Sequence, residues 1–110
     1  MKGAISVERG IENKFLSLPD EEKAAVISHG AAIRFSDLSN RFFLAQSRIR
    51  FFEEKYCVKL LELEESGLPD DASYEMHEDF IMWHHWTEVA DKVRRQTELL
   101  KAILEYGVYR

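Results

Sequence analysis

The stretch AAVISHGAAIRFSDLSNRFFLAQSRIRFFEEKY at residues 24–56 decides the fold. Small and apolar residues recur in it at alternating steps of four and three, which is the seam of a packed helix. The seam consists of Ala24, Ser28, Ala31, Phe35, Leu38, Phe42, Ala45, Ile49, Phe52 and Tyr56. Pro19 and the acids after it suit a first helical turn, so we expect one long helix over residues 19–56. Gly30 leaves open whether that helix is broken.

A second long helix is expected over residues 73–105. Its predicted seam is Met82, Trp86, Val89, Val93, Gln96, Leu100 and Ile103, widened by Trp83, Ala90, Thr97 and Leu104. The connection holds a short helix at 60–65 and an acidic loop, after which Asp70, Asp71 or Ser73 can cap the next helix. Because this connection is short, the two long helices should pack as an antiparallel hairpin.

The chain of 110 residues is expected to be one all-α domain, with a further short helix at residues 5–16. Ser17 is a candidate cap for the long helix that follows. No run approaches the length of a membrane span, and the first twenty residues lack a continuous apolar segment. The single cysteine, Cys57, favours a reducing compartment. These features predict a cytoplasmic protein.

Apolar side chains are more numerous on residues 19–56 than one seam requires. Phe43, Leu44 and Phe51 point away from the seam, and exposed aromatic patches usually mark an interface. We expect a homodimer or a higher oligomer that completes a helical bundle through this face. The alternatives are that helix 5–16 or the C-terminal residues 106–110 cover it. Trp83 and Trp86 are interpreted as anchors of the core or of the interface.

A basic column flanks the seam at Arg34, Arg41, Arg48 and Lys55, with seven residues between successive members. Such a column corresponds to the g positions of a coiled coil and favours pairing with carboxylates of a neighbouring helix. The alternative is nucleic-acid binding through these four residues and Arg50. The net charge of -5 and eight carboxylates between Glu62 and Asp79, without any Lys or Arg, do not favour it as the first choice.

Candidates for chemistry are few. His77, His84 and Glu88 share one helix face and are the candidates for a metal site in a helical bundle. However, His77 and His84 are about 10 Å apart along a helix, too far to share one ion. Cys57 has no identifiable base and is expected to pack or to cap a helix. No phosphate loop or metalloprotease motif is present, so we expect no cofactor, no metal and no catalytic residue.

Three segments carry a resemblance to a known group of proteins. They are RFFEEKY at 50–56, ESGLPDD at 65–71 and YEMHEDFIMW at 74–83. Over residues 41–105 the chain resembles small prokaryotic helical-hairpin proteins, some of them encoded beside toxins of the TumE-like type. The resemblance implies an antitoxin-like or partner-binding role. The chain departs from the pattern at Cys57, where a glycine commonly ends the helix, and at His84 and His85.

The sequence therefore favours a non-enzymatic protein–protein interaction module. Nucleic-acid binding by the basic column and a metal-binding helical bundle are the alternatives.

Overall fold

A computed structural model shows four helices and describes the backbone of residues 2–108 and the side chains of residues 9–106. The helices are α1 (Lys2–Leu16), α2 (Asp20–Tyr56), α3 (Leu60–Ser66) and α4 (Tyr74–Val108). No strand occurs within residues 2–108. The predicted all-α class is confirmed. The outer limits differ from the predicted 5–16 and 73–105 by about three residues, because hydrophobic periodicity does not locate the last turn of a helix.

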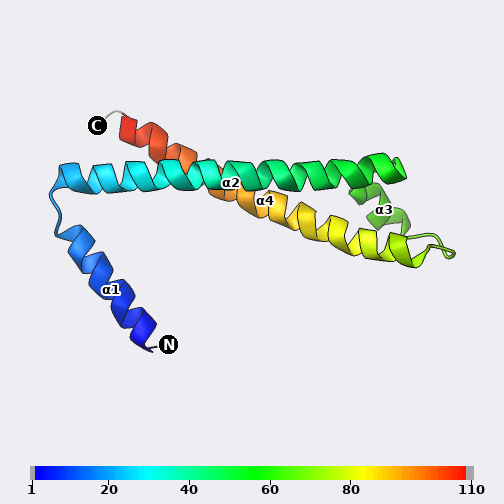
Figure 1. Ribbon diagram of the computed structural model, residues 1–110, viewed down its shortest axis with the longest axis horizontal. Coiled ribbons are helices and arrows are strands. Elements are labelled where there is room, and N and C mark those ends of the chain that lie inside the picture. Colours follow the sequence, from blue (N-terminus) through cyan, green and yellow to red (C-terminus); the bar gives the residue numbers. More distant parts are fainter. Residues whose placement is uncertain (1, 109–110) are drawn as a thin grey trace.

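The two long helices form the expected hairpin. α2 and α4 run antiparallel and cross, with α3 at the closed end, and α1 projects from the start of α2 (Figure 1). Every position of the predicted α2 seam is buried or half-buried, and Ala31, Leu38, Ala45 and Phe52 are its most buried members. The alternation of four and three residues was therefore sufficient to identify the face of α2 that packs on α4.

Gly30 does not interrupt α2. The helix is continuous over 37 residues, and a Cβ at Gly30 would meet no heavy atom within 4 Å. Gly30 is thus neither a break between two helices nor a point where another part of this chain approaches the backbone closely.

The predicted seam of α4 is confirmed except at its two ends. Met82 and Ile103 are exposed, whereas Trp83 and Ala90 are buried and Leu104 is half-buried. Apolar residues occupy both columns of α4, so periodicity does not decide between them. The choice is made by packing, because the large indole of Trp83 fits against the rings at the end of α2.

The core lies at the closed end of the hairpin. Phe52, Leu60, Leu63 and Trp83 form its buried cluster, and Trp83 is fully buried. The Trp83 ring stacks on Phe52 at a centroid distance of 5.7 Å and on Tyr56 at 6.0 Å. The Trp83 Nε1 is buried and has no hydrogen-bond partner within the described residues. The short helix α3 thus closes the core with two leucines, whereas the rest of the hairpin is a single pair of helices.

The helix ends show which predicted caps form. The Ser73 Oγ accepts a hydrogen bond from the Met76 N–H at 3.0 Å and caps α4, one of the three predicted options. The prediction that Ser17 caps α2 is wrong, because its hydroxyl donates to the Asn13 carbonyl at 2.9 Å and α2 begins after Pro19. Cys57 ends α2 in the left-handed conformation, with φ 56°.

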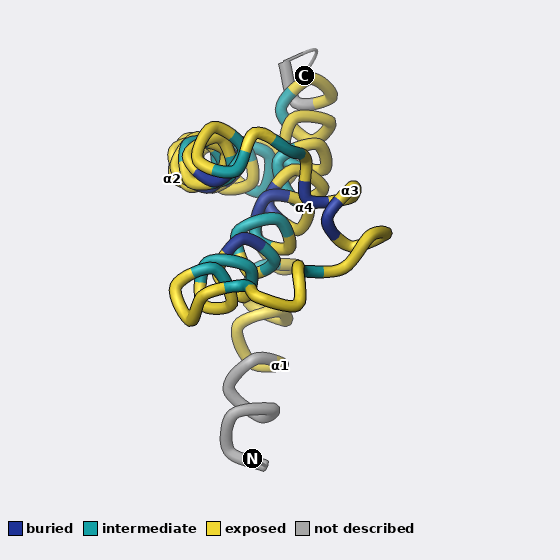
Figure 2. Tube along the Cα trace, turned by 90° about the vertical axis from the view of Figure 1, so that its right-hand side faces the viewer, coloured by how far each residue is buried: buried dark blue, intermediate teal, exposed yellow. Residues whose placement is uncertain are grey.

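The molecule is elongated, with principal extents of 64 × 38 × 19 Å. Its radius of gyration is 20.5 Å, against about 13 Å for a compact domain of this length. Figure 2 shows buried residues only along the contact of α2 with α4 and at α3. A single layer of two helices leaves one long side of each without cover.

Candidate interaction surface

The side of α2 opposite α4 carries a straight apolar line. Leu44 follows Val26, and Phe51 follows Ile33, by 18 residues, which is about five full turns. These four side chains therefore project within about 20° of one another on a straight helix. All four are exposed, Ile33 by 64% and Phe51 by 57%. We call this line, from Val26 to Phe51, the outer face of α2; it is about 37 Å long.

Phe43 widens the outer face and is 69% exposed. Between it and Phe51 lies Ser47, whose hydroxyl donates to the Phe43 carbonyl at 2.9 Å. Ser47 thus has its hydrogen bond within the helix, so covering it would leave no hydroxyl unpaired. The exposed Asp37 and Asn40 are the polar residues beside the middle of the outer face.

The exposure of Phe43, Leu44 and Phe51 agrees with the sequence analysis, whereas Val26 and Ile33 were missed. Counting in heptads from the α2 seam places Val26 and Leu44 in different columns. The spacing of 18 residues would have revealed them, because it follows the true period of a straight α-helix.

The rest of the described chain does not cover the outer face. α1 leaves α2 in another direction, and no element lies beyond α2 in the view along the hairpin (Figure 2). Ile11 and Leu16 of α1 are themselves exposed. The alternative that helix 5–16 covers this face is therefore wrong for its described side chains. The other alternative was that the C-terminal residues 106–110 cover this face. Of their side chains only that of Tyr106 is described, so this alternative lies largely outside the described residues.

The two tryptophans do not belong to the outer face. Trp83 is fully buried in the hairpin core, and Trp86 is half-buried on α4 beside the Arg48 guanidinium, which lies 6.0 Å from the centroid of its ring. Both serve packing of α2 on α4, which is the core alternative of the sequence analysis.

The basic column is engaged only in part. Lys55 Nζ pairs with Asp79 Oδ2 at 2.6 Å and with Glu75 Oε2 at 3.5 Å, both on α4. Arg34 and Arg41 are exposed and form no ion pair with a described residue. The predicted pairing with carboxylates of the neighbouring helix thus holds for Lys55 alone within the hairpin.

Asp79 joins the closed end of the hairpin through its Oδ2, which accepts from Lys55 and, at 2.5 Å, from the Tyr56 hydroxyl. The hydrogen bonds from Lys55 and then Tyr56 lower the pKa of Asp79. Burial, followed by the hydrogen bond to Asp79, raises the pKa of Tyr56. The hydrogen bond to Asp79 raises the pKa of Lys55. Lys55, Tyr56 and Asp79 thus bond to one another, and this geometry indicates that they stabilise the contact of α2 with α4.

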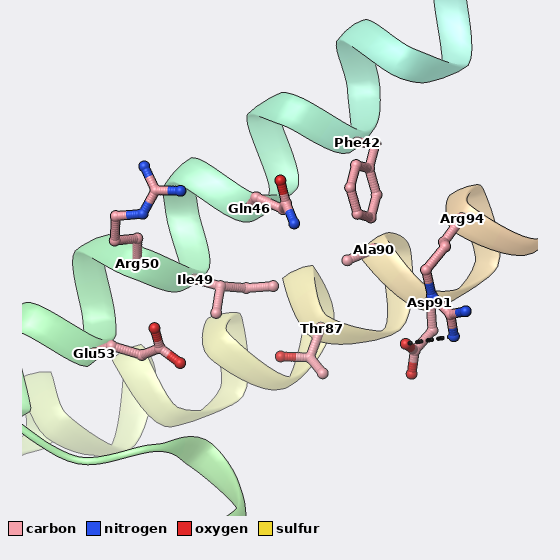
Figure 3. A pocket seen from close by; sticks show the side chains of 9 residues that line it. All are labelled: Phe42, Gln46, Ile49, Arg50, Glu53, Thr87, Ala90, Asp91 and Arg94. Atoms are coloured by element: carbon pink, nitrogen blue, oxygen red, sulfur yellow. Dashed lines mark ion pairs between the residues drawn. The ribbon is translucent and has the colours of Figure 1, made fainter. Parts of the chain in front are cut away.

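A groove of about 380 Å³ lies at the middle of the hairpin (Figure 3). Arg50 and Glu53 line it from α2, and Asp91 and Arg94 line it from α4, where these two form an ion pair at 3.7 Å. The Thr87 hydroxyl donates to the Trp83 carbonyl at 2.9 Å and is thereby occupied. The groove combines two guanidiniums with two carboxylates, without a histidine or cysteine among its lining residues.

A second, larger groove of about 850 Å³ lies where the open ends of α2 and α4 diverge. Its lining is mostly apolar and includes Ala24 and Ile27 of α2 and Leu99 and Ile103 of α4. The pairing of α2 with α4 is thus least complete at the end farthest from α3.

The metal candidates are not gathered into one site. His84 Nδ1 lies 3.3 Å from Glu64 Oε1 of α3, and its ring meets the Phe80 ring edge-on. His77 and Glu88 are exposed. Within the described part of the chain, no group of three His, Cys, Asp or Glu side chains could hold a metal ion.

No family model, curated protein or solved structure matches the chain. No helix among the described residues is long and apolar enough to cross a membrane.

Proposed function

We propose that this protein is a non-enzymatic protein–protein interaction module that binds its partner through the outer face of α2. The observation that carries the proposal is the alignment of Val26, Ile33, Leu44 and Phe51 on a side of the helix that the described chain leaves open. A surface helix normally places polar residues on the side away from its own core. Continuous apolar patches on that side are typical of interfaces.

The accessible surface of the chain supports the same conclusion. It measures 8693 Å², about 2,400 Å² more than a compact monomer of this mass exposes. Part of the excess belongs to α1. A standard interface buries about 800 Å² on each partner, so the excess is large enough for a stable one.

The alternative of nucleic-acid binding has weaker support. Lys55 is paired with Asp79 and Glu75, and Arg48 lies beside Trp86. Of the stripe, Arg34, Arg41 and Arg50 are exposed without an ion pair among the described residues. A gel-shift experiment at low salt tests this alternative, and no retardation of RNA or DNA is expected.

The proposal is tested by native mass spectrometry of the tagged full-length chain isolated from its own cells. We expect a complex, with itself or with another protein, that Phe51→Asp disrupts and Ile81→Asp leaves intact. Ile81 is the matched control because it is 60% exposed but lies on α4. A small neighbouring toxin-like protein, as the sequence resemblance implies, is one partner to look for. A wild-type chain recovered only as a free monomer would refute the proposal.

A further inference from the structure

We propose that the partner on the outer face of α2 is a second copy of this chain, whose α2 lies antiparallel to the first. This inference rests on the proposed function and specifies the partner. The reason is that the outer face is self-complementary about the middle of the helix. α2 extends from Asp20 to Tyr56, so its middle lies at Leu38.

A two-fold axis relates the apolar residues of the two copies. It crosses the outer face of α2 at the height of Leu38 and Ser39 along the helix. It places Val26 opposite Phe51 of the second copy, and Ile33 opposite Leu44 of the second copy. Each pair occurs twice by symmetry, which gives four apolar contacts, two on either side of a polar centre formed by Asp37 and Asn40. An interface between identical surfaces requires this kind of symmetry.

The sizes of the flanking residues also match in this register. Phe43 of one copy falls between Ala32 and Ser36 of the other, on the same flank of the helix pair. Both are small, and both are exposed in the single chain. A large ring above two small residues is the knobs-into-holes arrangement that antiparallel helices use.

The charges at the centre of the register are opposite. On the other flank, Arg41 of one copy lies close to Asp37 of the second copy, again twice by symmetry. Neither residue forms an ion pair with a described residue of its own chain. The sequence pattern predicted that the basic column pairs with carboxylates of a neighbouring helix. In the dimer, Arg41 makes such a pair with the α2 of the second copy. A parallel arrangement places Arg41 opposite Arg41 and loses this match.

The assembled dimer is a layer of four helices with α2 and its copy at the centre and an α4 on each outer side. The outer faces then become the middle of a bundle. The hairpin, whose buried residues lie along the α2–α4 contact and at α3, thereby gains a second apolar contact about 37 Å long.

Two measurements test the inference. Sedimentation of the purified full-length chain should give twice the 12.9 kDa mass of one chain. Leu44→Asp should weaken the dimer by about 30-fold for each of its two symmetry-related copies, since each copy removes one interface hot spot. The exposed Leu61 of α3 provides the control, and Leu61→Asp should leave the mass unchanged. Circular dichroism of each variant shows that it remains helical.

Disulfide formation tests the register without destabilising substitutions. In a Cys57→Ser background, the double variant Ile33→Cys/Leu44→Cys should form a covalent dimer on mild oxidation. Ile33→Cys alone should not, because the two copies of position 33 are then about 16 Å apart along the antiparallel pair. A covalent dimer from Ile33→Cys alone would overturn the antiparallel register. A purified chain that stays monomeric at 100 µM but forms a complex with another protein would overturn this inference and leave the proposed function standing.

Discussion

The hydroxyl of Tyr56, the last residue of α2, donates a hydrogen bond of 2.5 Å to Asp79 in the second turn of α4. Lys55 donates to the same oxygen at 2.6 Å. Asp79 lies in the column of α4 that also contains Trp86 and Val93, at the edge of the buried core. The closed end of the hairpin is thus held by a carboxylate that accepts twice, next to the stacked ring of Trp83.

We expect Asp79→Ala to lower the free energy of unfolding by about 1–3 kcal/mol. The substitution leaves the half-buried Tyr56 hydroxyl without its acceptor and removes hydrogen bonds to a charged group. Urea unfolding followed by circular dichroism, at one fixed protein concentration, measures the change. The control is Glu78→Ala, an exposed neighbour, which should alter stability by less than about 0.5 kcal/mol. Equal effects of the two substitutions would contradict a fastening role for Asp79.

The stability of the protein should also depend on pH through Asp79. The ordinary pKa of Asp79 is 3.8, and hydrogen bonds from Lys55 and Tyr56 lower it in the folded state. The folded protein therefore binds this proton less readily than the unfolded chain does. The stability that Asp79 contributes is present above pH 3.8 and is lost as the pH falls through the lowered pKa of the folded state.

The variant Asp79→Asn isolates this contribution, because it keeps the size of the side chain and cannot titrate. The difference in urea midpoint between wild type and Asp79→Asn should be constant near neutral pH and should shrink below pH 3.8. A difference that does not change down to pH 2 would show that Asp79 titrates normally in the folded protein.

The two tryptophans should differ in fluorescence. Trp86→Phe leaves the fully buried Trp83 as the emitter, whereas Trp83→Phe leaves the half-buried Trp86. We expect the first variant to emit at shorter wavelength and to be quenched several-fold less by acrylamide. Trp83→Phe should destabilise the hairpin by less than the roughly 3–5 kcal/mol that is typical of a substitution to alanine. One reason is that phenylalanine removes the buried N–H of Trp83, which has no hydrogen-bond partner among the described residues. Equal quenching of the two variants would place Trp83 outside the core.

The elements that the sequence predicts well are those where one physical rule acts alone. The α2 seam was found in full because small or apolar residues occupy every one of its positions and polar ones mark the neighbouring columns. The predicted α4 seam is wrong only at its ends. Met82 and Trp83 are both apolar, and only the shape of the partner surface separates them. The sequence predicts that Lys55 pairs with a carboxylate of the neighbouring helix, but it does not single out Asp79. Glu75 and Glu78 lie within one turn of Asp79, and only the packing of the two helices selects among them.

Half of the outer face was predicted from the sequence for a similar reason. Phe43, Leu44 and Phe51 are conspicuous because they adjoin the seam's aromatic residues. Val26 and Ile33 lie in a more mixed segment, and a heptad count assigns them to another column. A heptad count drifts by about 20° per heptad on a straight helix. The wide seam tolerates this drift, whereas the narrow outer face aligns only when about 3.6 residues per turn are counted.

Two glycines should respond in opposite directions to alanine. Gly30 is helical, exposed and without a heavy atom within 4 Å of a Cβ, so Gly30→Ala should raise helix stability by about 1 kcal/mol. Gly67 ends α3 at φ 77°, a conformation that strains an L side chain, so Gly67→Ala should lower stability by about 1 kcal/mol. Thermal unfolding measures both. A stabilising Gly67→Ala would contradict the turn geometry after α3.

Cys57→Gly should stabilise the protein by about 1 kcal/mol. Cys57 is the only non-glycine residue with positive φ in the described chain, and its φ of 56° and ψ of 31° are left-handed. That conformation costs an L residue about 1–2 kcal/mol, which a glycine avoids. The Sγ of Cys57 lies 3.6 Å from the Glu54 carbonyl, a weak hydrogen bond that the substitution forfeits. Cys57→Ala separates the two effects, because it loses the thiol and keeps the strain, and it should be neutral or slightly destabilising. Because neither variant has the thiol, a Cys57→Gly protein that is no more stable than Cys57→Ala in urea would contradict backbone strain at the end of α2.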